Sequence, residues 1–174
     1  GSAVRGFNLD ASESTRVVDV MAVAFTNSAL DIEKWQTSMT KVSSIAANMG
    51  VDIEGTAAVM GVLADAGIEA SIGGTSLRNI FLKMANPTSA LAKRIGFVVN
   101  STDDMIRALK KLKNAQLGQL ELQGLVDVRQ VIAFQRMIDG IDTIDDYTTA
   151  LRNSAGAGQE MADIMEDSTK GSFK

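Results

Sequence analysis

The stretch Gly50–Pro87, GVDIEGTAAVMGVLADAGIEASIGGTSLRNIFLKMANP, predicts the element on which the rest of the fold depends. Asp52 is placed to cap a helix that continues to about Ala66, and Gly67 suits the left-handed turn that ends it. A second helix must end before Pro87, because proline disfavours helical geometry in the residue that precedes it. The two helices are therefore expected to fold back on each other as a tight αα-hairpin.

The second helix of this hairpin has one apolar face at helical spacing, made by Leu77, Ile80, Phe81 and Met84. We interpret Gly67, Gly73 and Gly74 as the link between the two helices. A glycine-rich segment before a helix also raises the question of a phosphate-binding loop, but Gly67–Ser76 lacks the lysine and the glycine spacing of that motif. Helix ends and close packing explain these glycines better than nucleotide binding does.

The run GVLADAGIEASIGGTSLRNIFLKMANP resembles the core signature of phage tail tape measure proteins: a helix end of the form LADAGI, a small-residue link, a GTxLR helix and an exit like LANP. The similarity extends from about residue 7 to residue 172 and is weaker between Phe97 and Tyr147. Gly74 departs from the pattern, because alanine is expected there. The resemblance implies a helical virion component around which tail tube subunits assemble and whose length sets the length of the tail.

The composition independently indicates an all-α fold. Hydrophobic residues make up 45% of the 174 positions and charged residues 22%, which is ordinary for a globular domain. Aromatic content is 5%, and nine methionines stand against one proline, so short helices packed through aliphatic and methionine side chains are favoured over a sheet. The fold class we predict is a compact multi-helix bundle of short helices with glycine-terminated αα-hairpins.

Charge and residue types exclude several classes of function. The 17 basic and 21 acidic residues give a net charge of −4, so no overall field favours nucleic acid or an anionic membrane. The chain has no histidine and no cysteine, which excludes triads, thiol nucleophiles and imidazole or thiolate metal sites. The longest unbroken apolar run, Val20–Phe25, is far below the ~18 residues of a membrane span. We predict no enzyme activity, no catalytic, cofactor-binding or metal-binding residues, and no cofactor.

Outside the hairpin, capping residues predict where most helices begin. Asp10 with Glu13 is expected to start a helix that ends near Asn27, and Asp31 a longer one ended by Gly50. The apolar seam of that longer helix comprises Ile32, Trp35, Met39, Val42, Ala46 and Met49. Whether the monomer satisfies this seam or leaves part of it for another chain is open at this stage.

The second half of the chain is expected to form further short helices. Pro87 opens one that Gly96 stops, and Ser101 with Asp104 forms a capping box for the next. The residues between Gln116 and Leu125 are interpreted as helical. One later helix carries Val128, Val131, Ile132, Phe134 and Ile138, another is capped by Thr143 with Asp146, and a last one carries Met161, Ile164 and Met165.

Three clusters could suggest chemistry, and each has a simpler explanation. The basic run Arg107, Lys110, Lys111 and Lys113 lies at a predicted helix end, where cations complement the helix dipole. The aspartates Asp139, Asp142, Asp145 and Asp146 miss the spacing of a calcium loop. The adjacent pairs Asp103–Asp104 and Glu166–Asp167 cannot point the same way on a helix, so paired-carboxylate hydrolysis is not supported. The methionines, among them Met21, Met39, Met49, Met60 and Met84, are assigned to the core, although an adaptable binding surface is the alternative.

We divide the chain into three parts. Residues 1–2 are interpreted as a tag-cleavage scar, 3–153 as the helical domain, and 154–174 as a flexible link followed by a helix that continues in a longer parent protein. The resemblance implies a structural role in tail assembly and tail-length determination, in the virion tail after synthesis in the bacterial host cytoplasm. The implied partners are copies of the chain itself, the tail tube protein, tail assembly chaperones and tail-tip proteins. The alternatives are a non-catalytic helical interaction module of a bacterial protein, or a domain attached to a cell-wall-degrading tail enzyme.

Overall fold

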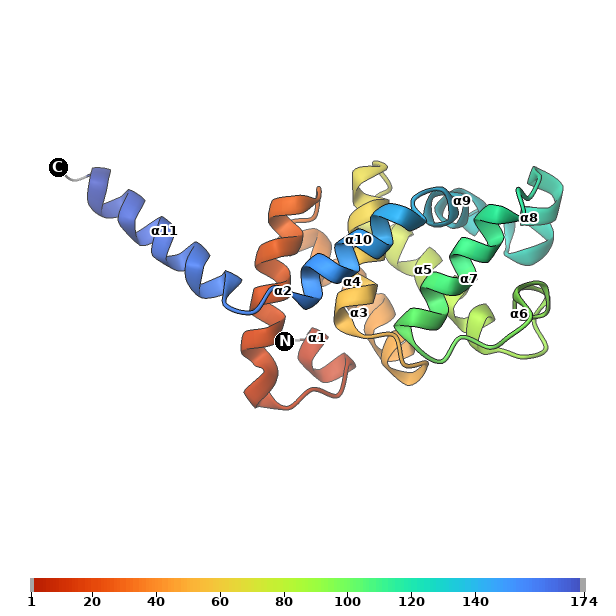
Figure 1. Ribbon diagram of the computed structural model, residues 1–174, viewed down its shortest axis with the longest axis horizontal. Coiled ribbons are helices and arrows are strands. Elements are labelled where there is room, and N and C mark those ends of the chain that lie inside the picture. Colours follow the sequence, from red (N-terminus) through yellow and green to blue (C-terminus); the bar gives the residue numbers. More distant parts are fainter. Residues whose placement is uncertain (1, 173–174) are drawn as a thin grey trace.

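All regular structure is helical in residues 2–172, the part of the chain that the computed structural model describes (Figure 1). No strand forms within these residues, which confirms the predicted all-α class. Two short 3-10 helices are η1 (Ala11–Glu13) and η2 (Val128–Gln130). The α-helices are α1 (Ser2–Gly6), α2 (Ser14–Asn27), α3 (Ile32–Asn48), α4 (Ile53–Asp65), α5 (Ala70–Ala85), α6 (Ala90–Ile95), α7 (Thr102–Asn114), α8 (Gln119–Leu125), α9 (Val131–Asp139), α10 (Ile141–Arg152) and α11 (Ala157–Ser172).

Helix α4 lies at the centre of the body, surrounded by α2, α3, α5, α9 and α10 (Figure 1). Every residue from Ile53 to Leu63 is buried. A helix that is apolar and small-sided on all faces can be covered on all faces, which is why this segment forms the core rather than an amphipathic outer layer. Its small residues let neighbours approach closely: a side chain at Gly55 would meet the methyl group of Thr102 in α7 at 2.5 Å.

The predicted hairpin forms. The carboxylate of Asp52 accepts a hydrogen bond from the backbone N–H of Gly55 at 2.7 Å, which caps α4. Gly67 has a φ of +78° and ends the helix, as its position predicts. The apolar face of α5 is fully buried, because Leu77, Ile80, Phe81 and Met84 all show 0% exposure.

Gly73 and Gly74 do not belong to the link between the two helices, and that interpretation is wrong. Helix α5 begins at Ala70, so both glycines lie in its first turns. Gly74 lies at a tight contact between helices: a Cβ atom there would stand only 3.1 Å from the Cα of Ser38 in α3. Glycine at this position therefore permits the close approach of α3 and α5, a tertiary contact that local sequence does not reveal.

Several predicted helix ends are confirmed. Asp31 caps α3 by accepting from the N–H of Lys34 at 2.8 Å, and Ser101 caps α7 by accepting from the N–H of Asp104 at 3.0 Å. Gly96 ends α6 with a φ of +93°.

Other predicted starts are corrected. Asp10 makes no side-chain cap and precedes η1, and α6 is capped by Ser89 rather than opened by Pro87. Helix α10 begins at Ile141, directly after Gly140, so Thr143 lies inside it and cannot be its cap.

Three residues assigned to buried faces are exposed. Ile32 is 49% exposed, Val128 73% and Ile132 68%. Ile32 lies in the first turn of α3, and Val128 belongs to η2 rather than to α9. Ile132 follows Val131, which is buried, so the two neighbours point to different sides of α9. The remaining seam of α3 is buried within the monomer, with Trp35 in edge-to-face contact with Phe25 at 6.0 Å between ring centroids.

Helix α11 differs from the others in its placement. It starts beside α2 and extends away from the body formed by the other helices (Figure 1). From Gln159 to Thr169 every residue of α11 is exposed. None of the described helices is long and apolar enough to cross a membrane.

Candidate functional site

The basic run of α7 is engaged within the chain. Lys110 and Lys113 form ion pairs with α10, which joins the two helices across their surface, and the other two cations contact neighbouring groups. Lys110 pairs with Asp145 at 2.6 Å, and Lys113 pairs with Asp142 at 3.2 Å. Arg107 pairs with Asp104 at 3.1 Å and lies 3.9 Å from the ring centroid of Phe97. Lys111 donates a hydrogen bond to the carbonyl of Ile95 at 2.6 Å. The hydrogen bond to Asp145 is the main reason that the pKa of Lys110 is raised.

The acidic residues considered as metal ligands or acid–base pairs do not converge. Asp142 and Asp145 each pair with a lysine of α7. Asp103 approaches Arg152 at 3.7 Å, whereas Asp104 accepts from the backbone N–H of Asn100 at 3.0 Å, so the adjacent carboxylates have separate partners. In residues 2–172, no group of three or more carboxylate, imidazole or thiolate side chains is arranged to hold a metal ion.

An ion pair between the partly exposed Arg16 and the buried Glu54 links α2 to the centre of the molecule. Arg16 donates to both carboxylate oxygens of Glu54, at 2.7 and 2.8 Å, and its third nitrogen contacts Glu13 at 2.9 Å. The side chain of Glu54 is only 6% exposed, and the hydrogen bonds that Arg16 donates to it are the main cause of the raised pKa of Arg16. Through this bidentate contact, the pair holds α2 on α4.

A second polar network lies at the start of α4. Besides capping that helix, Asp52 accepts from the hydroxyl of Thr102 at 2.9 Å and from Arg152 at 3.1 Å. The backbone N–H of Asp52 donates to the same Thr102 hydroxyl at 2.9 Å. The network joins the first turns of α4 and α7 to the end of α10. Asp52 was predicted as a cap, but its two distant partners, 50 and 100 residues away, leave no signal in the local pattern.

Asp19 in α2 fixes the start of α11. It is 5% exposed, and its carboxylate accepts from the backbone N–H groups of Gly156 and Gly158 at 3.0 and 2.8 Å. Asp19 therefore acts as an N-terminal cap supplied from another helix. The residues that connect α10 to α11, predicted as a flexible link, are thus hydrogen-bonded to the body at this point. The signal that could have revealed Asp19 is that it is the one charged residue within the otherwise apolar run Val17–Phe25.

A groove opens between α3 and α5, beyond the close contact at Gly74. It has a volume of about 380 Å³ and is lined by Thr40, Lys41, Ser44, Ile45, Thr75 and Arg78. Within residues 2–172, neither Lys41 nor Arg78 forms an ion pair, although most other surface cations of α7 and α2 do. We call this feature the α3–α5 groove.

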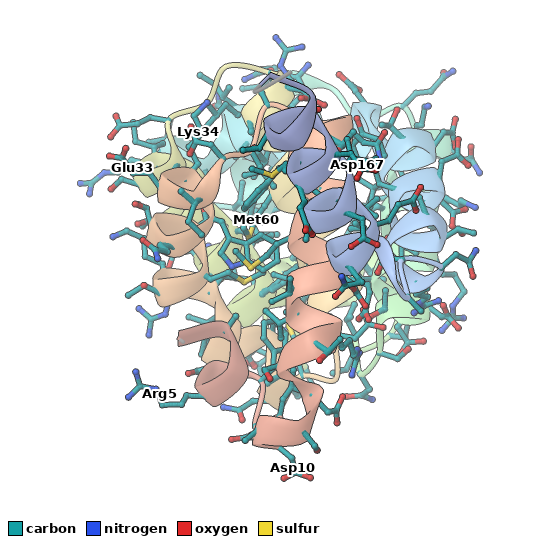
Figure 2. All side chains as sticks on the ribbon, turned by 90° about the vertical axis from the view of Figure 1, so that its left-hand side faces the viewer. Arg5, Asp10, Glu33, Lys34, Met60 and Asp167 are labelled. Carbon is teal, nitrogen blue, oxygen red and sulfur yellow. The ribbon has the colours of Figure 1, made fainter. Side chains whose placement is uncertain are left out.

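The methionines divide between the core and α11. Met39, Met49, Met60 and Met84 are buried, as predicted, and Met21 is partly buried against the core. Figure 2 shows Met60 in the interior of the body, behind α2 and α3. In contrast, Met161 and Met165 of α11 are 38% and 64% exposed, and Ile164 between them is 59% exposed. We call these three residues the α11 seam.

Taken together, these features define an all-helical protein whose polar clusters hold its helices together. Comparison with known families agrees: the family described as phage-related minor tail protein matches residues 1–170. The chain belongs to this family.

Two relatives are phage tape measure proteins. The chain is 32% identical to the tape measure protein of Pneumococcus phage Dp-1, over 95% of this chain and 16% of that protein. It is 25% identical to the probable tape measure protein of Escherichia phage P2, over 97% of this chain and 23% of that protein. No solved structure matches the chain. The resemblance to phage tail tape measure proteins is therefore confirmed, and the chain spans less than a quarter of the length of these relatives.

Proposed function

We propose that this chain is a structural segment of a phage tail tape measure protein, which acts through protein–protein contacts in tail assembly and tail-length determination. The chain is a component of the virion tail, made in the cytoplasm of the bacterial host. Its partners are copies of itself, the tail tube protein, tail assembly chaperones and tail-tip proteins. It performs no catalysis, a proposal supported by the absence of histidine and cysteine and by the pairing of the carboxylates of Glu54 and Asp52.

The burial of α4 is the observation that supports an assembly role most directly. A helix measures length by extending, at ~1.5 Å per residue, but α4 and α5 fold back on each other and are enclosed by other helices. This region therefore contributes little to an extended ruler. We infer that α4 and α5 provide a folded body for contacts with other proteins and add little extended length to the tail.

Deleting Gly50–Pro87 from the full-length protein tests this role. The deletion removes the core helix and exposes the faces of α3 that contain Met39 and Val42, so we expect tail assembly to be blocked or misdirected. Electron microscopy of particles from the mutant phage shows whether tails form and how long they are. Infectious virions with tails uniformly shorter by roughly 57 Å, the 38 deleted residues at helical rise, would contradict the proposal.

A matched variant changes packing without changing chain length. Gly74→Val forces α3 and α5 apart while every residue remains, so an assembly role predicts the same failure as the deletion. If the segment acts only as a ruler, Gly74→Val tails should form normally and have full length.

A further inference from the structure

The α11 seam is an apolar surface without a partner in the monomer. Its three side chains lie at positions i, i+3 and i+4, which places them on one side of the helix. After its first turn, α11 does not rest on the body (Figure 1). An isolated helix of 16 residues is marginal in water, because tertiary packing normally supplies most of its stability. A binding partner that covers the seam would supply that packing.

The charge of α11 restricts what this partner can be. The helix contains the acidic residues Glu160, Asp163, Glu166 and Asp167 and a single basic residue, Lys170. Two α11 helices pairing seam to seam would bring these like charges together, which is unfavourable. The partner surface is therefore expected to be basic, with room for apolar side chains.

The α3–α5 groove has these properties. Lys41 and Arg78, one from each wall, offer two cations that have no acidic partner among the described residues. Ile45 contributes an apolar surface, and Ile72, 54% exposed, lies six residues before Arg78 in α5. The hydroxyl-bearing residues Thr40, Ser44 and Thr75 complete the lining.

We propose that α11 of one copy of this chain docks into the α3–α5 groove of a second copy. The acidic residues of the helix would face Lys41 and Arg78, and the seam would cover Ile45 and the neighbouring apolar surface of α5. A second copy is required because α11 begins on α2 and extends away from the body (Figure 1). Figure 2, viewed from that side, shows α11 with Asp167 in front of α2, while Glu33 and Lys34 mark the start of α3 at another edge.

The contact joins different surfaces of the two copies, so it is heterologous. Contacts of this kind either close into a ring or build an open chain of copies, and an open chain has one free helix and one free groove at its ends. The inference deepens the proposed function by naming the contact between copies, but its test uses the isolated chain and does not depend on tail assembly.

Two charge-reversal variants of the 174-residue chain test the contact. The groove variant, Lys41→Glu with Arg78→Glu, reverses the charge of the α3–α5 groove. The helix variant, Asp163→Lys with Asp167→Lys, reverses the charge at two positions of α11. Analytical ultracentrifugation at low salt should show concentration-dependent association of the unaltered chain above its 18.4 kDa monomer. Each variant alone should weaken that association at least tenfold, and 0.5 M salt should weaken it as well.

Mixing the two variants is the decisive step. The acidic α11 of the groove variant meets an unaltered groove on the helix variant, and the reversed helix meets the reversed groove, so the mixture should associate again. Lys93→Glu with Arg94→Glu, two exposed cations on α6, is the matched control and should leave association unchanged. Circular dichroism verifies that every variant keeps its helical content and melting temperature.

Three results would overturn the proposal. The unaltered chain could remain monomeric up to millimolar concentration at low salt. The helix variant could lose association while the groove variant keeps it, which would indicate pairing through α11 alone. The mixture could fail to associate although both variants are folded. Any of these would leave the proposed role in tail assembly standing, because that role is tested in the phage.

Discussion

Asp19 and Gly158, 139 positions apart in the sequence, are joined by a hydrogen bond of 2.8 Å from the backbone N–H of Gly158 to the Asp19 carboxylate. The same carboxylate accepts from Gly156, whose φ is +86°. A side chain at Gly158 would stand 2.8 Å from the Cγ1 of Val18, so glycine is needed for the chain to pass this close to α2. The body and the projecting helix therefore meet at a defined joint.

Asp19→Ala should loosen this joint without unfolding the body. Losing the capping carboxylate costs about 1–2 kcal/mol at the start of α11. Amide hydrogen exchange at Gly156 and Gly158 is therefore expected to accelerate about tenfold or more, since each ~1.4 kcal/mol corresponds to a factor of ten. Asp163→Ala, which removes an exposed carboxylate from the middle of α11, is the control. Unchanged protection at both glycines would show that Asp19 does not hold the helix.

Two adjacent glycines of α5 should respond to alanine in opposite ways. At Gly73 a Cβ atom meets its nearest neighbour at 3.5 Å, an ordinary contact, so Gly73→Ala should stabilise the protein by up to about 1 kcal/mol through helix propensity. At Gly74 the Cβ atom would press on the backbone of Ser38 at 3.1 Å, and Gly74→Ala should cost about 1–3 kcal/mol. Urea unfolding of both variants measures the difference. Equal effects would mean that α3 and α5 are not in close contact.

Gly67→Ala tests the turn between α4 and α5. No atom lies within 4 Å of the position of the new Cβ, so the cost comes only from the backbone, whose φ is +78°. We expect a loss of about 1–2 kcal/mol in the free energy of unfolding. Gly124→Ala in α8, also with open space but without a positive φ, should be neutral or slightly stabilising. A Gly67 variant as stable as the Gly124 variant would rule out the left-handed turn.

Removing Arg16 should show how much the ion pair between Arg16 and Glu54 contributes to stability. Arg16→Ala leaves the carboxylate of Glu54 buried without its bidentate partner, and we expect a loss of about 2 kcal/mol, reduced from the value for a fully buried pair because Arg16 is partly exposed. Glu13→Ala removes the exposed partner of the same arginine and should cost less than about 1 kcal/mol. Thermal melts of the two variants check the order. A larger loss of stability in Glu13→Ala than in Arg16→Ala would contradict this prediction.

The carboxyl of Asp104 should titrate below its ordinary pKa of 3.8, mainly because it accepts a hydrogen bond from the backbone of Asn100 and also because it pairs with Arg107. A depressed folded-state pKa adds stability above the unfolded value, and this contribution is lost as the pH falls through the folded-state value. NMR titration of the side-chain carboxyl carbon measures the pKa. Arg107→Ala should raise it, whereas Arg129→Ala, on η2, should not.

Local capping explains why many helix boundaries could be predicted. In each confirmed cap the acceptor side chain lies three residues before the donor N–H, so the sequence itself brings the partners together. The donors and acceptors are Lys34 and Asp31, Gly55 and Asp52, and Asp104 and Ser101. Prediction failed where no side-chain cap sets the start of the helix. Thr143 resembles a cap, but α10 starts earlier because it follows directly on α9 through Gly140.

The candidate surfaces could be predicted only in part. The seam residues of α11 were identified as the apolar residues of a helix, but periodicity cannot tell whether such a face is covered. The α3–α5 groove was not predicted, because Lys41 and Arg78 are 37 positions apart and meet only through the packing of two helices. Likewise Ile132 fits the spacing of a buried face, yet α9 turns it to solvent.

The sequence by itself determined the all-α class, the central hairpin and the family, because helix periodicity, caps and a family signature are properties of residues close together in the chain. The tertiary structure alone decided that Gly74 lies at a helix crossing, that Asp19 caps a helix 139 residues away, and that α11 leaves the body with its apolar seam uncovered. The physical reason is that these features depend on which helix surfaces meet. Local hydrogen bonding and side-chain spacing do not specify that choice, whereas close packing of the whole body does.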